Sequence, residues 1–295
     1  MKKTRREFLK ATANSSALIA LSTVAGVSVE AQAAKNKGEH APTVKASDGP
    51  GLKIHRGHIF HIAGAPAKVS DATKSLEWFP DGALAVDPKG RILFCGHWKD
   101  LPANLVGAKV VDHKGSYILP GFVDTHMHFP QVFCGDSYGG GQLLEWLNNC
   151  IFPSEGLLAD PVYAKVAATE WCDRMIRSGT TMGLIFGSAF PHAQDLLFQT
   201  ARDRGLRIVC GRGIETVAPE WSKLKTSEED AIRMVREEIE KWHPLNEAAR
   251  RDALQFVAVV PRFSLSVTPK TMAALGDLYA EYRDRGVYFT SHLNE

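Results

Sequence analysis

Hydrophobic and polar positions change their spacing along the chain, and the change divides it into two regions. Residues 52–118 contain short apolar runs that Gly, Pro and Asp interrupt, a pattern typical of strands joined by turns. From residue 119 onwards, short apolar runs alternate with longer segments in which apolar side chains recur every three or four positions. This alternation predicts strands separated by helices, and therefore a parallel sheet built from βα units.

The second region carries start and stop signals for its helices. Asp160-Pro161 and Thr268-Pro269 each pair a helix-capping side chain with Pro at the first helical position, and Gly179 and Gly286 close the same two helices. Five strands are expected around the helices, at Ile118–His126, Thr180–Phe186, Leu206–Gly211, Gln255–Val260 and Val287–Ser291.

The predicted fold class is α/β, an incomplete TIM-like (β/α) barrel preceded by a small β-sandwich domain. An open, doubly wound sheet is the alternative, but no Gly-rich phosphate fingerprint follows the first strand. Residues 117–295 number 179 and yield five strands, whereas a full barrel has eight strands and about 250 residues. We therefore expect a truncated barrel or one part of a split protein.

The first 34 residues have the pattern of an export signal. The run Thr4–Lys10 (TRREFLK) resembles a twin-arginine signal, and an apolar stretch and small residues at 31–33 follow it. This predicts a bacterial protein exported to the periplasm. The predicted organisation is a signal peptide at 1–34, a linker at 35–51, the β-sandwich part at 52–118 and the first five βα units at 119–295.

The charge and the distribution of apolar residues argue against nucleic acid and membrane as partners of the mature chain. The chain has a formal net charge of +2, and residues 1–34 alone hold five basic and two acidic groups, so the remainder carries 2 − 3 = −1. A nearly neutral body gives no electrostatic footprint for nucleic acid. No later stretch reaches the roughly 20 apolar residues that a transmembrane helix needs, so we expect no stable membrane span in the mature chain.

The strongest chemical signal is the segment Asp124–His128 (DTHMH). Side chains alternate faces along a strand, so His126 and His128 point the same way, and paired imidazoles suit Zn²⁺ or Fe²⁺. His292 directly follows the fifth expected strand and would face the same site as His126 and His128. Glu295, three residues later, supplies a carboxylate that could transfer a proton. Read by spacing alone, His292 and Glu295 could equally be terminal polar groups.

A third group follows the fourth strand. Arg262 offers fixed donors for a carbonyl or ring nitrogen, and Phe263 offers a face for a flat ring. A surface arginine and a core phenylalanine are the alternative. Two other catalytic motifs are missing from the sequence: H-x-E with P-C-x-x-C, and the G-x-S-x-G of serine hydrolases.

The run Pro120–Gln131 (PGFVDTHMHFPQ) resembles the first-strand motif of the amidohydrolase superfamily, and within it the chain is similar to the guanine deaminases. Further stretches support the second resemblance, at Leu144–Leu147, Phe152–Glu155, Pro261–Ser266 and Ser291–Glu295. The resemblance implies a β-sandwich with a TIM-like barrel, a zinc ion and a homodimer in the full-length family. It implies metal ligation by His126, His128 and His292, proton transfer by Glu295, and guanine contacts from Gln131, Arg262 and Phe263.

The reaction implied by the resemblance is hydrolytic deamination of guanine to xanthine and ammonia by metal-activated water. The family also uses a later histidine and a late-strand aspartate, and nothing in this sequence follows Glu295. We therefore expect the 295-residue chain alone to have little or no deaminase activity. Two alternatives are an amidohydrolase that deaminates an amino-triazine or pyrimidine, and a non-catalytic split or degenerate fragment.

Overall fold

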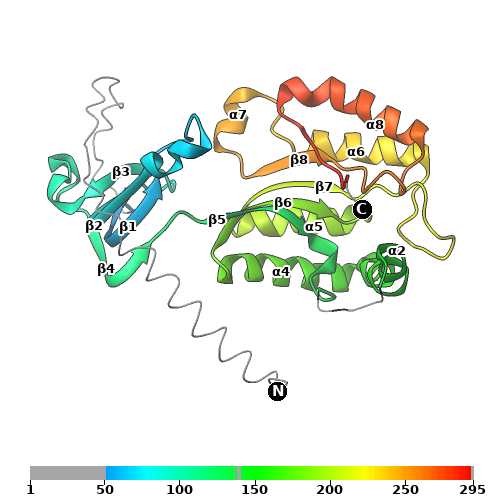
Figure 1. Ribbon diagram of the computed structural model, residues 1–295, viewed down its shortest axis with the longest axis horizontal. Coiled ribbons are helices and arrows are strands. Elements are labelled where there is room, and N and C mark those ends of the chain that lie inside the picture. The colour runs from blue at the N-terminus through cyan, green and yellow to red at the C-terminus, as the bar shows by residue number, and fades with distance from the viewer. Residues whose placement is uncertain (1–50, 136, 138–140, 294–295) are drawn as a thin grey trace, which may run out of the picture.

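The structure is a computed structural model that describes residues 51–135, 137 and 141–293 (Figure 1). The predicted signal peptide, almost all of the predicted linker, and Glu295 lie outside the described residues.

The first described region forms a four-stranded sheet with the order β3-β2-β1-β4. Its strands are β1 Lys53–Ile62, β2 Leu76–Val86, β3 Ile92–His97 and β4 Lys109–Ile118. Strand β1 pairs with β2 antiparallel and with β4 parallel. Short 3₁₀ turns at Val69–Ser75, Trp98–Asp100 and Ala103–Leu105 connect the strands. Ile54, Ala83, Ala85 and Leu105 form its small apolar core.

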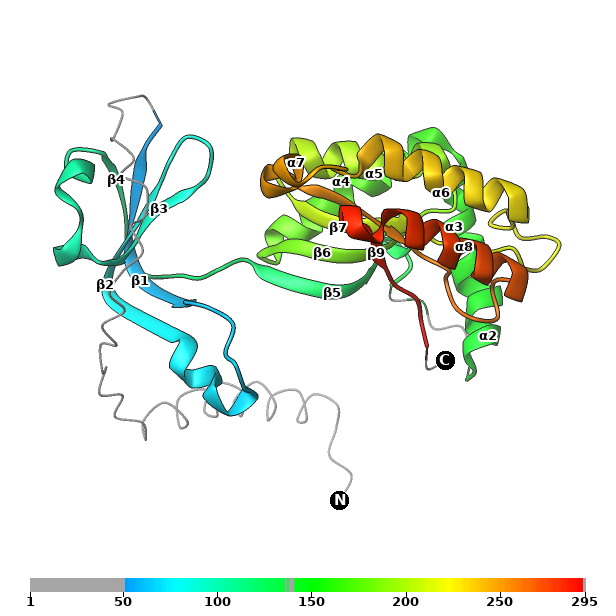
Figure 2. The same ribbon diagram turned by 90° about the horizontal axis from the view of Figure 1, so that it is seen from above.

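The second region is a five-stranded parallel sheet with the order β5-β6-β7-β8-β9. Its strands are β5 Phe122–His128, β6 Thr180–Gly187, β7 Arg207–Arg212, β8 Gln255–Val259 and β9 Tyr288–Phe289. Figures 1 and 2 show that an extended connection from β4 to β5 links the two sheets. An ion pair between Arg91, before β3, and Asp252, at the end of α7 Glu247–Asp252, also joins the two regions.

Both faces of the parallel sheet are apolar, which explains the continuous hydrophobic runs of its strands. Along β8, Val257 and Val259 join the large core beneath the helices, whereas Phe256 and Ala258 join a second cluster on the opposite face. Strands β6 and β7 repeat this alternation. The sheet therefore has one face covered by helices and one that lines the interior of a half-barrel.

The helices that cover the sheet are α4 Pro161–Arg177, α5 Pro191–Asp203, α6 Glu228–Trp242 and α8 Pro269–Tyr282. The two predicted caps are present: the side chains of Asp160 and Thr268 each accept a backbone N–H bond at the start of their helix. Ser227 caps α6 in the same way. Gly286, predicted to close α8, adopts a φ of +87°, a conformation that glycine tolerates without strain. It follows a 3₁₀ turn at Arg283–Arg285 that extends α8.

Several short elements have no strong pattern in the sequence. They are the 3₁₀ turns Phe129–Gln131 and Leu157–Ala159, the helices α2 Leu143–Trp146, α3 Phe152–Gly156 and α7 Glu247–Asp252, and a π-helical turn at Leu147–Ile151. The α2–α3 segment lies between β5 and α4 and brings Glu155 into the interior.

The predicted fold class is confirmed: the chain is α/β, with a parallel half-barrel preceded by a small β domain. Among the described residues, no helix is both long and apolar enough to cross a bilayer.

Candidate active site

The carboxyl ends of the parallel strands bring the predicted site residues together. His126 and His128 belong to the end of β5, and Phe186 lies near the end of β6. The chain beyond β8 carries Arg262, and a parallel bridge between Phe263 and His292 continues the sheet beyond β8 and β9. This is the edge at which α/β barrels place their binding residues.

Three histidines form an imidazole cluster: His126, His128 and His292. The Nε2 atom of His292 lies 3.1 Å from Nε2 of His128 and 3.2 Å from Nε2 of His126. The ligand nitrogens of all three residues lie within 4.8 Å of one another. His292 is 164 positions from His128 and 166 from His126 in the sequence, and the fold brings their ring nitrogens together.

A neighbouring main-chain group sets the tautomer of His292. Its Nδ1 atom lies 2.7 Å from the carbonyl oxygen of Arg262, which can only accept, so Nδ1 carries a proton and, in the neutral ring, Nε2 carries the lone pair. His292 also donates its backbone N–H to the same carbonyl at 3.1 Å. Such a bond is the usual support of a metal-binding imidazole, because it fixes both the ring orientation and the tautomer.

The donor set fits a divalent cation. Tetrahedral Zn²⁺ with Zn–N distances of 2.0–2.1 Å separates neighbouring ligand nitrogens by about 3.3 Å, close to the two spacings seen here. Burial lowers the pKa of His128 to about 2, and Arg262 and the other two histidines act in the same direction. His128 therefore stays neutral at physiological pH, and the neutral imidazole is the form that binds a metal.

Phe186 supports the imidazole cluster from β6. Its ring is stacked on His128 with 4.8 Å between centroids and lies 4.1 Å from the ring of His292. Phe186 is buried and belongs to the apolar cluster inside the half-barrel. Asp124, also on β5, accepts the backbone N–H of His126 at 3.0 Å.

A second group, the arginine cluster, consists of Glu155, Glu215 and Arg262. Arg262 is 5% exposed and donates two bonds to Glu155, from Nη1 at 2.6 Å and from Nη2 at 3.0 Å. Its Nη1 also donates to Glu215 at 3.1 Å. Such a two-bond arginine–carboxylate pair has a fixed geometry, and its charges compensate one another in the interior.

The two carboxylates of the arginine cluster differ. Glu155 receives both parallel bonds, whereas Glu215 receives one and its Oε2 has no partner among the described residues. Burial raises the pKa of Glu215 to about 7, although Arg262 opposes the shift; Glu155 adds to it. Near neutral pH, the carboxyl group of Glu215 is therefore partly protonated.

Gln131 and Phe263 lie beside the arginine cluster. Gln131 donates its amide Nε2 to Glu155 at 3.0 Å. Phe263 is 5% exposed and packs in an apolar cluster with residues of the α2–α3 segment, including Phe152. The structure thus brings Gln131 and Arg262 to one carboxylate and places the ring of Phe263 in a packed environment.

Six of the seven site residues predicted from the sequence are among the residues that the structure describes, and three of them form the imidazole cluster. Glu155, Glu215 and Phe186 have no predicted role in the sequence. Phe186 ends the expected strand Thr180–Phe186, so the sequence pattern could have predicted its position at the rim of the barrel. Glu155 and Glu215 follow no spacing rule, because their partner Arg262 is 107 and 47 positions away.

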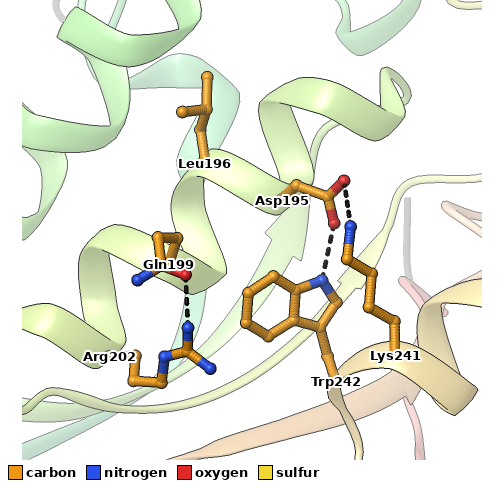
Figure 3. Close-up of a pocket in the computed structure, with 6 residues that line it drawn as sticks. All are labelled: Asp195, Leu196, Gln199, Arg202, Lys241 and Trp242. Carbon is orange, nitrogen blue, oxygen red and sulfur yellow. Dashed lines mark hydrogen bonds and ion pairs between the residues drawn. The ribbon is translucent and has the colours of Figure 1, made fainter.

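A surface groove lies elsewhere, between α5 and α6 (Figure 3). Figure 3 shows Asp195 accepting bonds from Lys241 at 2.9 Å and from the indole Nε1 of Trp242 at 2.7 Å. The imidazole and arginine clusters do not line this groove. Its polar contacts tie the two helices to each other.

Comparisons with known proteins agree with this architecture. Residues 117–295 match the amidohydrolase family. The chain is 39% identical over 250 residues to the probable guanine deaminase of Deinococcus radiodurans, covering 83% of this chain and 53% of that one.

Two solved structures are also similar. The E. coli guanine deaminase has a TM-score of 0.71 and 30% identity, over 82% of this chain and 53% of that chain. The guanine deaminase of C. acetobutylicum with bound guanine in the active site has a TM-score of 0.69 and 25% identity, over 83% of this chain and 53% of that chain. The chain spans about half the length of the curated relatives it matches. On the family match and the shared half-barrel, this chain belongs to the amidohydrolase family.

Proposed function

We propose that this chain supplies the metal-binding and ring-binding half of a guanine deaminase, which converts guanine and water to xanthine and ammonia. The observation that carries the proposal is the position of Arg262. Its backbone carbonyl accepts a hydrogen bond from His292 of the imidazole cluster. Its side chain donates to Glu155, which also accepts from Gln131. One residue thus connects a metal site to polar groups suited to a nitrogenous ring.

The imidazole cluster would hold the cation, and Zn²⁺ is the ion we propose. A divalent cation supplies Lewis acidity and makes water a nucleophile near neutral pH. Gln131 and Arg262 would orient the ring, and Phe263 would contribute an apolar face beside it. Glu295, which lies outside the described residues, is the proposed carrier of a proton from the water to the departing ammonia.

The proposal is tested by a ligand panel presented to the purified, zinc-loaded chain. Guanine, adenine, cytosine and an amino-triazine are compared by equilibrium dialysis, and xanthine and ammonia are measured in the same samples. We expect zinc-dependent binding of guanine in preference to the other three, with little xanthine formed by the 295-residue chain alone. Preference for the triazine or cytosine, or no zinc-dependent binding of guanine, would overturn the proposed function.

A further inference from the structure

Glu155 joins the two polar side chains proposed to contact the ring. Its Oε1 atom accepts from Nη2 of Arg262 and from Nε2 of Gln131, each at 3.0 Å. Its Oε2 atom accepts from Nη1 of Arg262 at 2.6 Å. Because one oxygen atom serves both side chains, the amide of Gln131 and the guanidinium of Arg262 are held next to each other.

The shared carboxylate determines which way the amide of Gln131 points. A carboxylate only accepts hydrogen bonds, so the amide must turn its NH₂ group toward Glu155. The carbonyl Oε1 of Gln131 then points away from Glu155 and remains an acceptor for a ligand. A neutral side chain at 155 could donate as well as accept, and it would permit the amide to turn over.

The same contacts limit the donors that Arg262 retains. A guanidinium has five N–H groups. The bonds to Glu155 and Glu215 use both hydrogens of Nη1 and one of Nη2. Among the described residues this leaves the second Nη2 hydrogen and Nε–H for a ligand. Arg262 is therefore a donor beside the acceptor presented by Gln131.

We propose that Glu155 is a positioning residue that sets the ring specificity of the site: it fixes Gln131 as an acceptor next to Arg262 as a donor. This pair complements guanine, whose ring edge presents a carbonyl oxygen next to an N–H. It does not complement adenine, whose corresponding edge presents an amino group next to a ring nitrogen without a proton. The inference rests on the proposed function, since it concerns how that site selects its purine.

Burial and charge support a dedicated role for Glu155. Its side chain is 4% exposed, and burying a carboxylate is costly unless it is paired and fully hydrogen-bonded. Glu215 already places one carboxylate on Arg262, so the guanidinium has a counter-charge without Glu155. Of the two carboxylates, Glu155 is the one that accepts from Gln131 among the described residues.

The test compares hypoxanthine with adenine, which differ at the carbonyl and N–H edge and carry no 2-amino group. Binding to the zinc-loaded chain is measured by equilibrium dialysis for the wild type, Glu155→Gln and Glu215→Gln. We expect Glu155→Gln to reduce the preference for hypoxanthine at least about tenfold, since an acceptor contact is lost or reversed. Glu215→Gln makes the same chemical change on the same guanidinium and should weaken both ligands while keeping their ratio.

A second variant covers the case in which Glu155→Gln does not fold, which circular dichroism and zinc stoichiometry would show. Gln131→Met removes the acceptor itself and should lower the same preference by a similar factor. An unchanged preference in either folded variant would overturn the inference, as would an equal loss in Glu215→Gln. Wild-type chain that fails to bind guanine would instead overturn the proposed function and this inference with it.

Discussion

The imidazole cluster and the arginine cluster meet at Arg262, but they achieve stability by different means. The arginine cluster contains its own counter-charges and nearly all its hydrogen-bond partners, and its three side chains are at most 6% exposed. The imidazole cluster directs nitrogen atoms at one another, and His126 is exposed. The first cluster is therefore part of the folded core, whereas the second presents ligand nitrogens that a bound cation would share.

The largest expected effect concerns the arginine cluster. Arg262→Met leaves two buried carboxylates without a counter-charge and should lower the free energy of unfolding by about 3–5 kcal/mol. His126→Ala should change it by less than about 0.5 kcal/mol in the presence of a chelator, because that ring is exposed. Urea unfolding measures both. Similar losses in the two variants would remove the distinction between the clusters.

The next effect is a pH dependence that belongs to Glu215. Its pKa rises from 4.5 to about 7 on folding, so the folded chain keeps a proton that the unfolded chain releases. This contribution to stability is complete below pH 4.5 and is lost as the pH rises through about 7, a change of about 3 kcal/mol. Glu215→Gln should flatten this part of the profile.

Glu238, buried beside Arg212, provides a matched control, because burial also raises its pKa to about 7. Glu238→Gln should remove a separate portion of the same decline, and the double variant should remove both. A Glu215→Gln profile parallel to that of the wild type from pH 4.5 to 7 would contradict the assignment.

The smallest of the three effects concerns the imidazole cluster. Zinc at 100 times its dissociation constant should stabilise the wild-type chain by about 2.7 kcal/mol, seen as a rise in the unfolding temperature that a chelator reverses. His292→Ala should abolish most of this rise, and Glu215→Gln should retain it. Equal stabilisation of His292→Ala by zinc would place the metal elsewhere.

The two clusters also differ in how far the sequence predicts them. His126 and His128 are two residues apart on a strand, so alternation alone places them on one face. His292 follows the fifth predicted strand, but spacing alone leaves it as either a metal ligand or a terminal polar group, and the family resemblance was needed to assign it to the metal site. The helix boundaries at Asp160, Ser227 and Thr268 were equally accessible, because capping is a local interaction.

The arginine cluster was not accessible from local rules. Glu155 reaches Arg262 because a π-helical turn and two short helices fold the segment after β5 into the interior, and no periodic pattern marks that path. Glu215 follows β7 in an irregular segment. The pairing of Glu155 and Glu215 with Arg262 depends on tertiary packing, so nothing local in the sequence distinguishes these two residues from glutamates on the surface.

The central claim is that His126 and His128 at the end of β5, and His292 beyond the end of β9, bind a single divalent cation. X-ray absorption spectroscopy of the zinc-loaded chain tests it most directly. We predict one zinc per chain with three imidazole nitrogens at about 2.0–2.1 Å, falling to two imidazoles in His292→Ala. Zinc without imidazole ligands, or an identical spectrum for wild type and His292→Ala, would contradict the claim.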